Sequence, residues 1–471
     1  MMRSLFSGVA GLRTHQTKMD VIGNNIANVN TVGYKSQSVT FQDLMYQTTQ
    51  ASSAANAQTG RGGINAKQIG LGVSTAAINA NVTTSGASQT TGNPFDVQIK
   101  GDSFFIVSDG ANNYFTRAGA FYVDGMGNLA MTSNGYTVMG WQEDPNEPGT
   151  IIKDTVTPLK IMSAENLTSE PEQTRQAYLS GVIDKNSTQL TSTEGLIVNI
   201  GIYDELGYSY VAKFSIKSST TPGQYSFTPV DLVDSKGYSL MHSSTENGYE
   251  KNGYDVAGGP QTTSPGTYPK TMNLTGGTNP GYLTYDTITG ESEDVTADGN
   301  DVPFRLTIGG IDAFPNEIVI GAGTSTMYDH KGTSTIKGNA GDYNGNYAGR
   351  KVGEMSGVAI AQDGKITATY DNGTSKLLGQ IAVANFANPS GLEKIGDNLY
   401  QSTPNSGAFD GIGDDITAGS GALSTGVLEM SNVDLSQEFT EMITTQRGFQ
   451  ANSRIITVSD SMLEELTNLK R

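Results

Sequence analysis

Apolar residues recur every seven positions at both ends of the chain. Near the start, this line runs through Leu5, Val9, Leu12, Met19 and Ile26. Near the end, it runs through Leu435, Phe439, Met442, Phe449, Ile456 and Leu463. An apolar stripe with a period near 3.5 is typical of a helix that packs against another helix. The pattern predicts amphipathic helices over 1–30 and 430–471.

The middle of the chain has the period of β-strands instead. Short alternating runs in 93–150 and 351–407 are separated by turn pairs such as Asp109-Gly110 and Asn372-Gly373. We expect these two distant pieces to form one discontinuous β domain. The insertion 151–350 holds further runs, LIVNIGIY, AKFSIKS, PFRLTIGG and NEIVIGAG, and predicts one all-β outer domain or two.

Small polar residues dominate 31–92 and 408–429, which we interpret as an extended connector region. The expected fold is therefore multidomain α+β, with the two terminal helices paired as an inner coiled-coil layer and β domains nested outside them. A single amphipathic helix would ordinarily pack on its own domain. Two of them at opposite ends of a β-rich chain favour packing on each other and on neighbouring copies, which builds a helical filament.

The stretch NNIANVNTVGYK follows the first apolar stripe directly. Asparagine is a poor interior helix residue because its amide competes for backbone hydrogen bonds. We expect Asn24, Asn25 and Asn28 in the last turns of the helix, where their amides can bond carbonyls left open at a helix end. Gly33 is a candidate for a positive φ angle as the chain turns away.

Composition narrows the possible functions. The 471 residues carry a formal net charge of −18 and no basic run, which argues against a nucleic-acid partner. The absence of cysteine excludes disulfides and thiolate chemistry. No segment has the ~18–20 consecutive apolar residues of a membrane span, and the start is not a convincing cleavable signal peptide. We therefore expect no membrane insertion, and export, if it occurs, that keeps the N-terminus.

No pattern indicates catalysis. His15, His242 and His330 lack ligand spacing and are expected to be exposed polar residues. The runs at 298–301 and 342–346 resemble calcium loops but lack the closing glutamate, so we interpret them as turns. Trp141 is expected to be a core or subdomain-contact anchor. The sequence thus predicts no enzyme, no cofactor and no metal site.

The asparagine stretch resembles the N-terminal signature of the flagellar rod and hook axial proteins. The residues that carry this signature are Asn24, Asn25, Asn28, Asn30, Thr31, Gly33, Tyr34 and Lys35. The closing segment from Ser431 is similar to the same family's final helix, through Gln446, Arg447, Gln450 and Asn452. Internal resemblance covers 93–141 and 357–407, so that about half of the chain is matched.

Within that family, a large central insertion is typical of hook subunits and is absent from distal rod subunits. The resemblance therefore implies a structural subunit of a hollow, curved hook that transmits torque as a universal joint. It also implies self-assembly, contact with rod, hook-cap and hook–filament junction proteins, and export by the flagellar type III apparatus to an extracellular site. A distal rod subunit and, in a different class, a secreted β-rich adhesin remain as alternatives.

Overall fold

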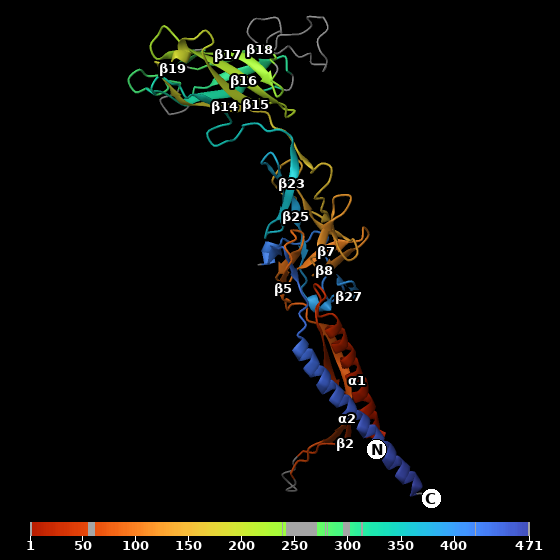
Figure 1. Cartoon of the computed structure of the whole chain (residues 1–471). Coiled ribbons are helices and arrows are strands. Elements are labelled where there is room, and N and C mark those ends of the chain that lie inside the picture. Colours follow the sequence, from red (N-terminus) through yellow and green to blue (C-terminus); the bar gives the residue numbers. More distant parts are fainter. Residues whose placement is uncertain are drawn as a thin grey trace, which may run out of the picture. The chain divides into compact units, whose positions relative to one another are not determined.

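The computed structural model describes residues 2–54, 62–237, 239–241, 271–277, 279, 281–294, 302–311, 314–419 and 421–469. The chain divides into two compact units. Unit 1 comprises Met1–Asn166, Gly357–Thr369 and Ser375–Arg471, and unit 2 comprises Leu167–Ser356 and Tyr370–Thr374. The described part is mostly β, with one long α-helix at each end of the chain (Figure 1). The predictions made for His242 and for 298–301 concern residues outside the described ones.

The two predicted helices are present in unit 1. Helix α1 spans Met2–Ala27 and α2 spans Leu435–Asn468. Helix α2 begins where the Asp434 carboxylate accepts hydrogen bonds from the backbone N–H groups of Ser436 and Gln437, as an N-cap does. Figure 1 shows the two helices side by side, although they come from opposite ends of the sequence. None of the described helices is long and apolar enough to cross a membrane.

The segment interpreted as a connector contains strands. Strand β1 (Gln37–Asp43) pairs antiparallel with β4 (Val73–Ala80), and β2 (Tyr46–Gln50) pairs with β3 (Lys67–Gly70). The first pair packs on α1, since the His15 and Phe41 rings lie edge to face at 5.8 Å. The small polar composition of this region therefore did not reveal two hairpins, because their side chains are largely exposed and show no clear alternation.

One large sheet of unit 1 combines strands from distant parts of the sequence. Its central order is β24 (Lys365–Tyr370), β25 (Ser375–Ile381), β11 (Thr137–Gln142), β7 (Phe104–Ser108), β8 (Asn113–Thr116), β28 (Leu399–Gln401) and β27 (Glu393–Gly396). The short strands β9 (Phe121–Val123), β10 (Leu129–Met131), β12 (Thr157–Pro158) and β26 (Val383–Ala384) extend it. Trp141 is buried in its core, and its indole N–H donates to the carbonyls of Asp154 and Ile412.

Two further strand pairs close unit 1 beside the helices. Strand β5 (Ser88–Thr90) pairs with β30 (Val427–Glu429), and β6 (Val97–Lys100) pairs with β29 (Ala422–Thr425). Both pairs join residues from the first quarter of the chain to residues just before α2. Strand β30 thus ends close to the start of α2.

Unit 2 consists of two sheets around one apolar core. The first has the order β18 (Thr271–Gly276), β20 (Phe304–Gly309), β21 (Ile318–Met327), β14 (Gln176–Ile183) and β22 (Lys337–Ala340). The second has the order β15 (Leu196–Tyr203), β16 (Ser209–Ser218), β17 (Gln224–Asp234) and β19 (Tyr282–Thr284). Stacked rings of Phe214 and Phe227, 4.7 Å apart, lie in the core. Two edge elements, β13 (Thr168–Ser169) and β23 (Gly353–Ile360), pair at the limits of this unit. The four-part division expected from the sequence remains a prediction.

Candidate assembly site

Helices α1 and α2 meet through glycines rather than through large apolar side chains. A Cβ atom on Gly8 would lie 3.4 Å from the Ile456 side chain, and one on Gly11 would lie 2.6 Å from Nδ2 of Asn452. On the opposite helix, a Cβ on Gly448 would lie 2.7 Å from the imidazole of His15. Each glycine therefore leaves a hole that a side chain of the other helix fills. Small residues allow the two helix backbones to approach closely.

Polar contacts continue this α1–α2 seam toward the start of α2. The Lys18 ammonium lies 3.1 Å from the Glu441 carboxylate, and the Asn25 amide donates to Glu438 Oε1 at 2.9 Å. The hydrogen bond from Lys18 lowers the pKa of Glu441, whereas burial raises the pKa of Glu438. The Lys18–Glu441 ion pair thus joins the opening helix to the closing helix.

The predicted heptad residues do not form the fully buried face of α1. Leu5, Val9, Leu12, Met19 and Ile26 are only half-buried, and so are Met442, Phe449, Ile456 and Leu463. Leu435 and Phe439 are exposed. The buried positions of α1 are instead Gly8, Gly11, Thr14, Ile22 and Asn25. The heptad pattern located the helices, but small and polar residues occupy the closest contact. The role of these apolar residues in assembly remains a prediction.

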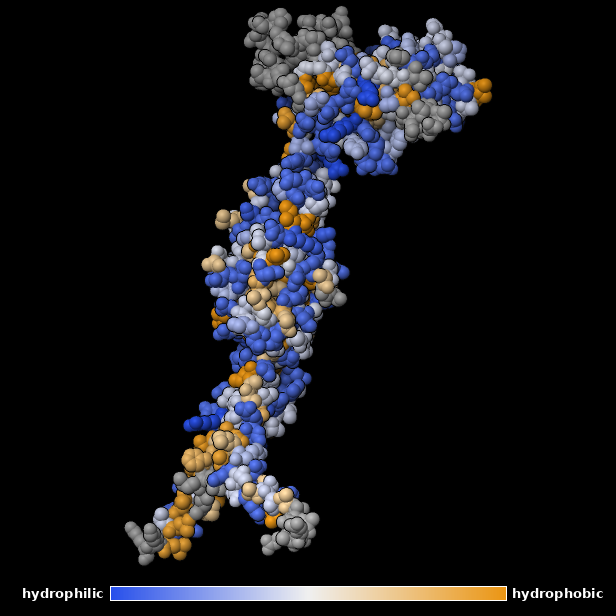
Figure 2. Space-filling model, turned by 180° about the vertical axis from the view of Figure 1, so that it is seen from behind, coloured by the Kyte–Doolittle hydropathy of each residue, from blue (hydrophilic) through white to orange (hydrophobic). Residues whose placement is uncertain are grey.

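A long apolar surface remains on the terminal helices. Its exposed members on α2 are Leu435, Phe439, Ile443, Ile455, Val458, Met462 and Leu466; Leu469 follows directly after α2, and Phe6 adds to the surface on α1. Figure 2 shows apolar residues gathered along this helical end of unit 1. Gln446, Arg447 and Gln450 are also exposed and interrupt the surface. Exposed apolar residues gathered in this way mark a site of protein–protein contact.

The asparagine stretch ties α1 to the arm that follows it. The Asn25 side chain exchanges two hydrogen bonds with the backbone of Gln37, at 2.8 and 2.9 Å, and also accepts from the Tyr34 hydroxyl. The Asn28 amide donates to the carbonyl of Asn24 at 2.9 Å, and this carbonyl also accepts from the Asn28 backbone N–H at 3.2 Å. Asn28 itself lies just beyond the last helical residue, Ala27, because the helix ends three residues before position 30, the end expected from the sequence.

The rest of the stretch turns the chain toward the β region of unit 1. Thr31 donates to the Asn28 side chain, and Asn30 is exposed. Gly33 has φ +68°, as predicted, and a Cβ there would lie 2.7 Å from the backbone nitrogen of Ala118. Only glycine satisfies both the left-handed conformation and this close approach.

Three buried charges lie immediately after this turn. The Lys35 ammonium lies 2.8 Å from Glu429 Oε1 and donates to the carbonyl of Thr84 at 2.7 Å. Arg117 Nη1 lies 3.7 Å from Glu429 Oε2, beyond hydrogen-bond distance, and its guanidinium stacks on the Phe104 ring. All three side chains are at most 1% exposed. Burial lowers the pKa of Lys35 and of Arg117, and Glu429 opposes both shifts.

A fourth cation lies next to this charge cluster. The Lys394 ammonium donates to the carbonyl of Lys35 at 2.9 Å and lies 4.8 Å from the centre of the Tyr34 ring. Burial lowers the pKa of Lys394 to about 8. Neither Arg117, Glu429 nor Lys394 was singled out by the sequence, because each lies outside the two terminal stretches and buried charges have no local sequence pattern.

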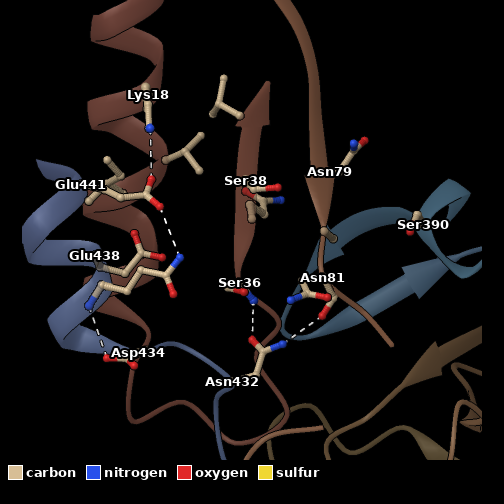
Figure 3. A pocket seen from close by; sticks show the side chains of 16 residues that line it. Lys18, Ser36, Ser38, Asn79, Asn81, Ser390, Asn432, Asp434, Glu438 and Glu441 are labelled. Atoms are coloured by element: carbon tan, nitrogen blue, oxygen red, sulfur yellow. Dashed lines mark hydrogen bonds and ion pairs between the residues drawn. The ribbon is translucent and has the colours of Figure 1, made fainter. Parts of the chain in front are cut away.

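A polar pocket of about 380 Å³ opens between α1, β1 and the start of α2. Figure 3 shows the Lys18–Glu441 ion pair on one wall and Asn432 on another. The Asn432 side chain accepts from the Ser36 N–H at 2.7 Å and donates to the carbonyls of Asn81 and Thr84. It thereby fixes the strands of the β1–β4 hairpin to the entry of α2.

The residues considered for metal binding make ordinary contacts. His15 is half-buried in the α1–α2 seam rather than exposed, whereas the ring of exposed His330 contacts the carbonyl of Thr333. Asp342 accepts from the N–H groups of Asn344 and Asn346, as a turn aspartate does. Among the described residues, no group of three or more acidic, histidine or cysteine side chains could hold a metal ion.

Three protein-family models match separate segments of the chain. "Flagella basal body rod protein" matches residues 5–35, and "Flagellar hook protein FlgE/F/G D1 domain" matches 98–169. "Flagellar basal body rod FlgEFG protein C-terminal" matches 424–469. Lys35, Arg117 and Glu429 come one from each matched segment. The buried charge cluster therefore joins all three segments in the folded chain.

Full-length relatives decide the family. The flagellar hook protein FlgE of Treponema pallidum is 36% identical over 100% of this chain and 100% of that protein. FlgE of Borreliella burgdorferi is also 36% identical, again over 100% of both chains. The chain belongs to the flagellar hook protein family. This hook family member also resembles the flagellar basal-body rod protein FlgG of Bacillus subtilis, at 29% identity over 100% of both chains.

Among solved structures, the crystal structure of the Helicobacter pylori flagellar hook protein FlgE2 aligns with a TM-score of 0.40 and 13% identity. The alignment covers 73% of this chain and 100% of that chain. The packing of this hook family member is defined by its own contacts, between the terminal helices and within the buried charge cluster.

Proposed function

We propose that this chain is a structural subunit of the bacterial flagellar hook and polymerises through its terminal helices. The observation that carries the proposal is the full-length similarity to flagellar hook proteins, at 36% identity. The exposed apolar surface of α2 supports polymerisation, because a soluble monomer rarely keeps such a surface in water. Identical chains that bury it head to tail without closing a ring form a helical tube.

The hook fits better than the two alternatives. The basal-body rod relative FlgG is less identical, at 29%, and this chain carries unit 2 as a large central insertion. An adhesin would not require both chain ends to match axial proteins of the flagellum. The proposed role is structural, with no catalytic step assigned to any residue.

In the proposed mechanism, the terminal helices and the β regions have different mechanical roles. Paired α1 and α2 form an inner coiled-coil layer that carries twist, and the β domains nest outside it with polar surfaces that slide as the tube bends. Half-buried residues such as Met442, Phe449 and Ile456 complete their burial against neighbouring copies. The tube then acts as a universal joint that transmits torque from rod to filament.

The remaining partners follow from the same role. A hook subunit contacts rod proteins at one end of the tube and hook–filament junction proteins at the other, and it assembles beneath a hook cap. We propose export through the flagellar type III apparatus without a cleaved signal peptide, which places the protein outside the cell. The four-part domain division expected from the sequence belongs to this proposal.

Electron microscopy of the purified, polymerised protein tests the proposal. Curved or supercoiled tubes are the expected result, whereas straight rods would favour the rod alternative. Failure to polymerise under any salt condition would contradict both.

A matched pair of variants tests the assembly surface. Ile443→Asp places a charge on exposed α2, and we expect it to abolish tubes while unit 1 keeps its thermal stability. Met126→Asp changes an apolar residue outside the helices that is even more exposed, at 80% against 58%, and should leave tubes intact. If the Ile443→Asp variant still forms tubes, this surface is not required for assembly.

A further inference from the structure

His15 occupies an unusual position in the α1–α2 seam. Its imidazole fills the space that a side chain at Gly448 would take, since a Cβ there would lie 2.7 Å from Cε1 and 2.8 Å from Nε2. The Phe41 ring of β1 packs against it edge to face. The ring nitrogen Nδ1 is buried and has no hydrogen-bond partner among the described residues.

This environment suits only the neutral ring. A protonated imidazole carries two N–H donors, and one of them would be the buried Nδ1, which faces no acceptor here. A buried donor without a partner costs free energy, and more so when it is charged. Protonation is therefore favoured only after the ring leaves the seam.

The charged groups near the ring add to this preference. Lys18 follows one turn later on α1, and its positive charge opposes a second one. Glu441 of α2 is engaged by Lys18 at 3.1 Å, and β1 contributes the uncharged ring of Phe41. On α2, the residue that contacts the ring is the uncharged Gly448. Burial, and after it Lys18, lower the pKa of His15 below its ordinary value of 6.5.

We infer that His15 is an acid-sensitive contact: when its ring takes up a proton, the α1–α2 seam loosens and subunits assemble less readily. The unpaired helices bind the proton more tightly than the paired ones. Pairing therefore weakens as the pH falls through the free value near 6.5, and the loss is complete below the pKa of the paired ring. Only the consequence for assembly depends on the proposed function.

The protonation step can be measured on the single chain. The protein has three histidines, so the ring resonances can be followed by NMR of histidine-labelled protein between about pH 5 and about pH 8. Spectra of His15→Gln and His330→Gln variants assign two of them. We expect His15 to titrate below 6.5, its ordinary value. Titration of His15 at or above this value would overturn the inference.

The effect on assembly is measured as the critical concentration for polymerisation over the same pH range. We expect it to rise on acidification by about tenfold for each unit that separates the His15 pKa from the free value. His15→Gln and His15→Leu should lose this dependence, and His330→Gln should keep it. Because burial raises the pKa of Glu438 toward the acid limit of this range, a Glu438→Gln variant separates its contribution.

The outcomes separate the inference from the function. A wild-type dependence that persists in both His15 variants contradicts the inference, even if tubes form normally. If the wild type forms no polymer at any pH, the proposed function fails, while the NMR titration still decides whether His15 is protonated only outside the seam.

Discussion

Glu429 is the anion that two buried cations share. Lys35 and Arg117 come from segments separated by roughly a fifth of the chain, and both carboxylate oxygens of Glu429 face them. Arg117 Nη1 and Glu429 Oε2 have no hydrogen-bond partner among the described residues, so the attraction between these two atoms is purely ionic. Removing Glu429 leaves Lys35 and Arg117 without their buried counter-ion in a site from which water is excluded.

Substitution of Glu429 is therefore expected to be costly. Glu429→Gln keeps the shape but leaves Lys35 and Arg117 uncompensated, and we expect the free energy of unfolding to fall by about 3–5 kcal/mol. Glu317→Gln is the matched control, because its pair with Arg305 is exposed and should contribute about 0–1 kcal/mol. Chemical unfolding of both variants measures the difference. Equal, small losses would show that the buried cluster is not a stabilising contact.

The lowered pKa of Lys394 predicts that the free energy of unfolding rises at alkaline pH. Its pKa is about 8 in the folded chain against 10.5 when exposed, so the unfolded chain binds more protons between these values. The free energy of unfolding should therefore increase with pH in this window, by at most about 1.4 kcal/mol per pH unit. Lys394→Met should flatten the increase, and exposed Lys365→Met should preserve it.

The measurement of this pH dependence has a natural upper limit. Burial raises the pKa values of Tyr34 and Tyr400, so the unfolded chain loses their protons first and stability declines above their ordinary value of 10.0. Unfolding curves recorded below pH 10 avoid the tyrosines, and the Lys394→Met variant separates Lys394 from Lys35, whose pKa is also lowered by burial. A flat profile for the wild type there would contradict the assignment.

At the scale of elements, the terminal helices were the most predictable feature. The seven-residue interval located α1 and α2 to within a few residues, and short runs located strands β15, β16, β20 and β21. The closest contact between the helices was not predictable, because an apolar stripe marks an apolar face and does not say which partner covers it. Glycines at 8, 11 and 448 carry no apolar signal at all.

Pairings between distant segments could not be predicted from the sequence either. Strands β14 and β21 are parallel neighbours although roughly 140 residues separate them, and neither has a local pattern that names the other. The same limit applies to the site: Asn25, Gly33 and Lys35 were singled out, but their partners Glu438, Ala118 and Glu429 were not. Local propensity specifies an element, and tertiary packing chooses its neighbours.

Two glycine substitutions test the helix seam directly. Gly23→Ala meets nothing within 4 Å, so it should stabilise α1 by about 1 kcal/mol through helix propensity alone. Gly448→Ala gains the same propensity but pushes its methyl group into the His15 ring. We therefore expect a net loss of helix stability in thermal unfolding followed by circular dichroism. An equal gain for both variants would mean that the ring can leave the seam freely.

At the scale of the whole molecule, unit 1 contains both termini and all three residues of the buried charge cluster, one from each segment that a family model matches. Unit 2 has its own apolar core, in which Phe214, Phe227 and Phe304 pack together. Its core does not draw on the terminal helices. The two units are therefore expected to be separable in function, with polymerisation assigned to unit 1.

Replacing Leu167–Ser356 by a short Gly/Ser linker tests this separation. We expect the shortened chain to polymerise, because α1, α2 and their exposed apolar surface are unchanged, and the tubes to differ in curvature or stiffness. Electron microscopy measures both properties. The same shortened chain with Ile443→Asp should form no tubes. Loss of polymerisation in the shortened chain alone would assign an assembly role to unit 2.

The partners in the helix seam stand at opposite extremes of the polypeptide. The ribosome makes Gly8, Gly11 and His15 among its first residues, and the side chains or spaces that complement them come more than four hundred positions later. A chain that stops before Glu438 keeps an unmatched first helix, however well its β units fold. A truncated copy therefore keeps the contacts of α1 with β1 and β4 but lacks α2, the helix whose side chains fill the spaces at Gly8 and Gly11.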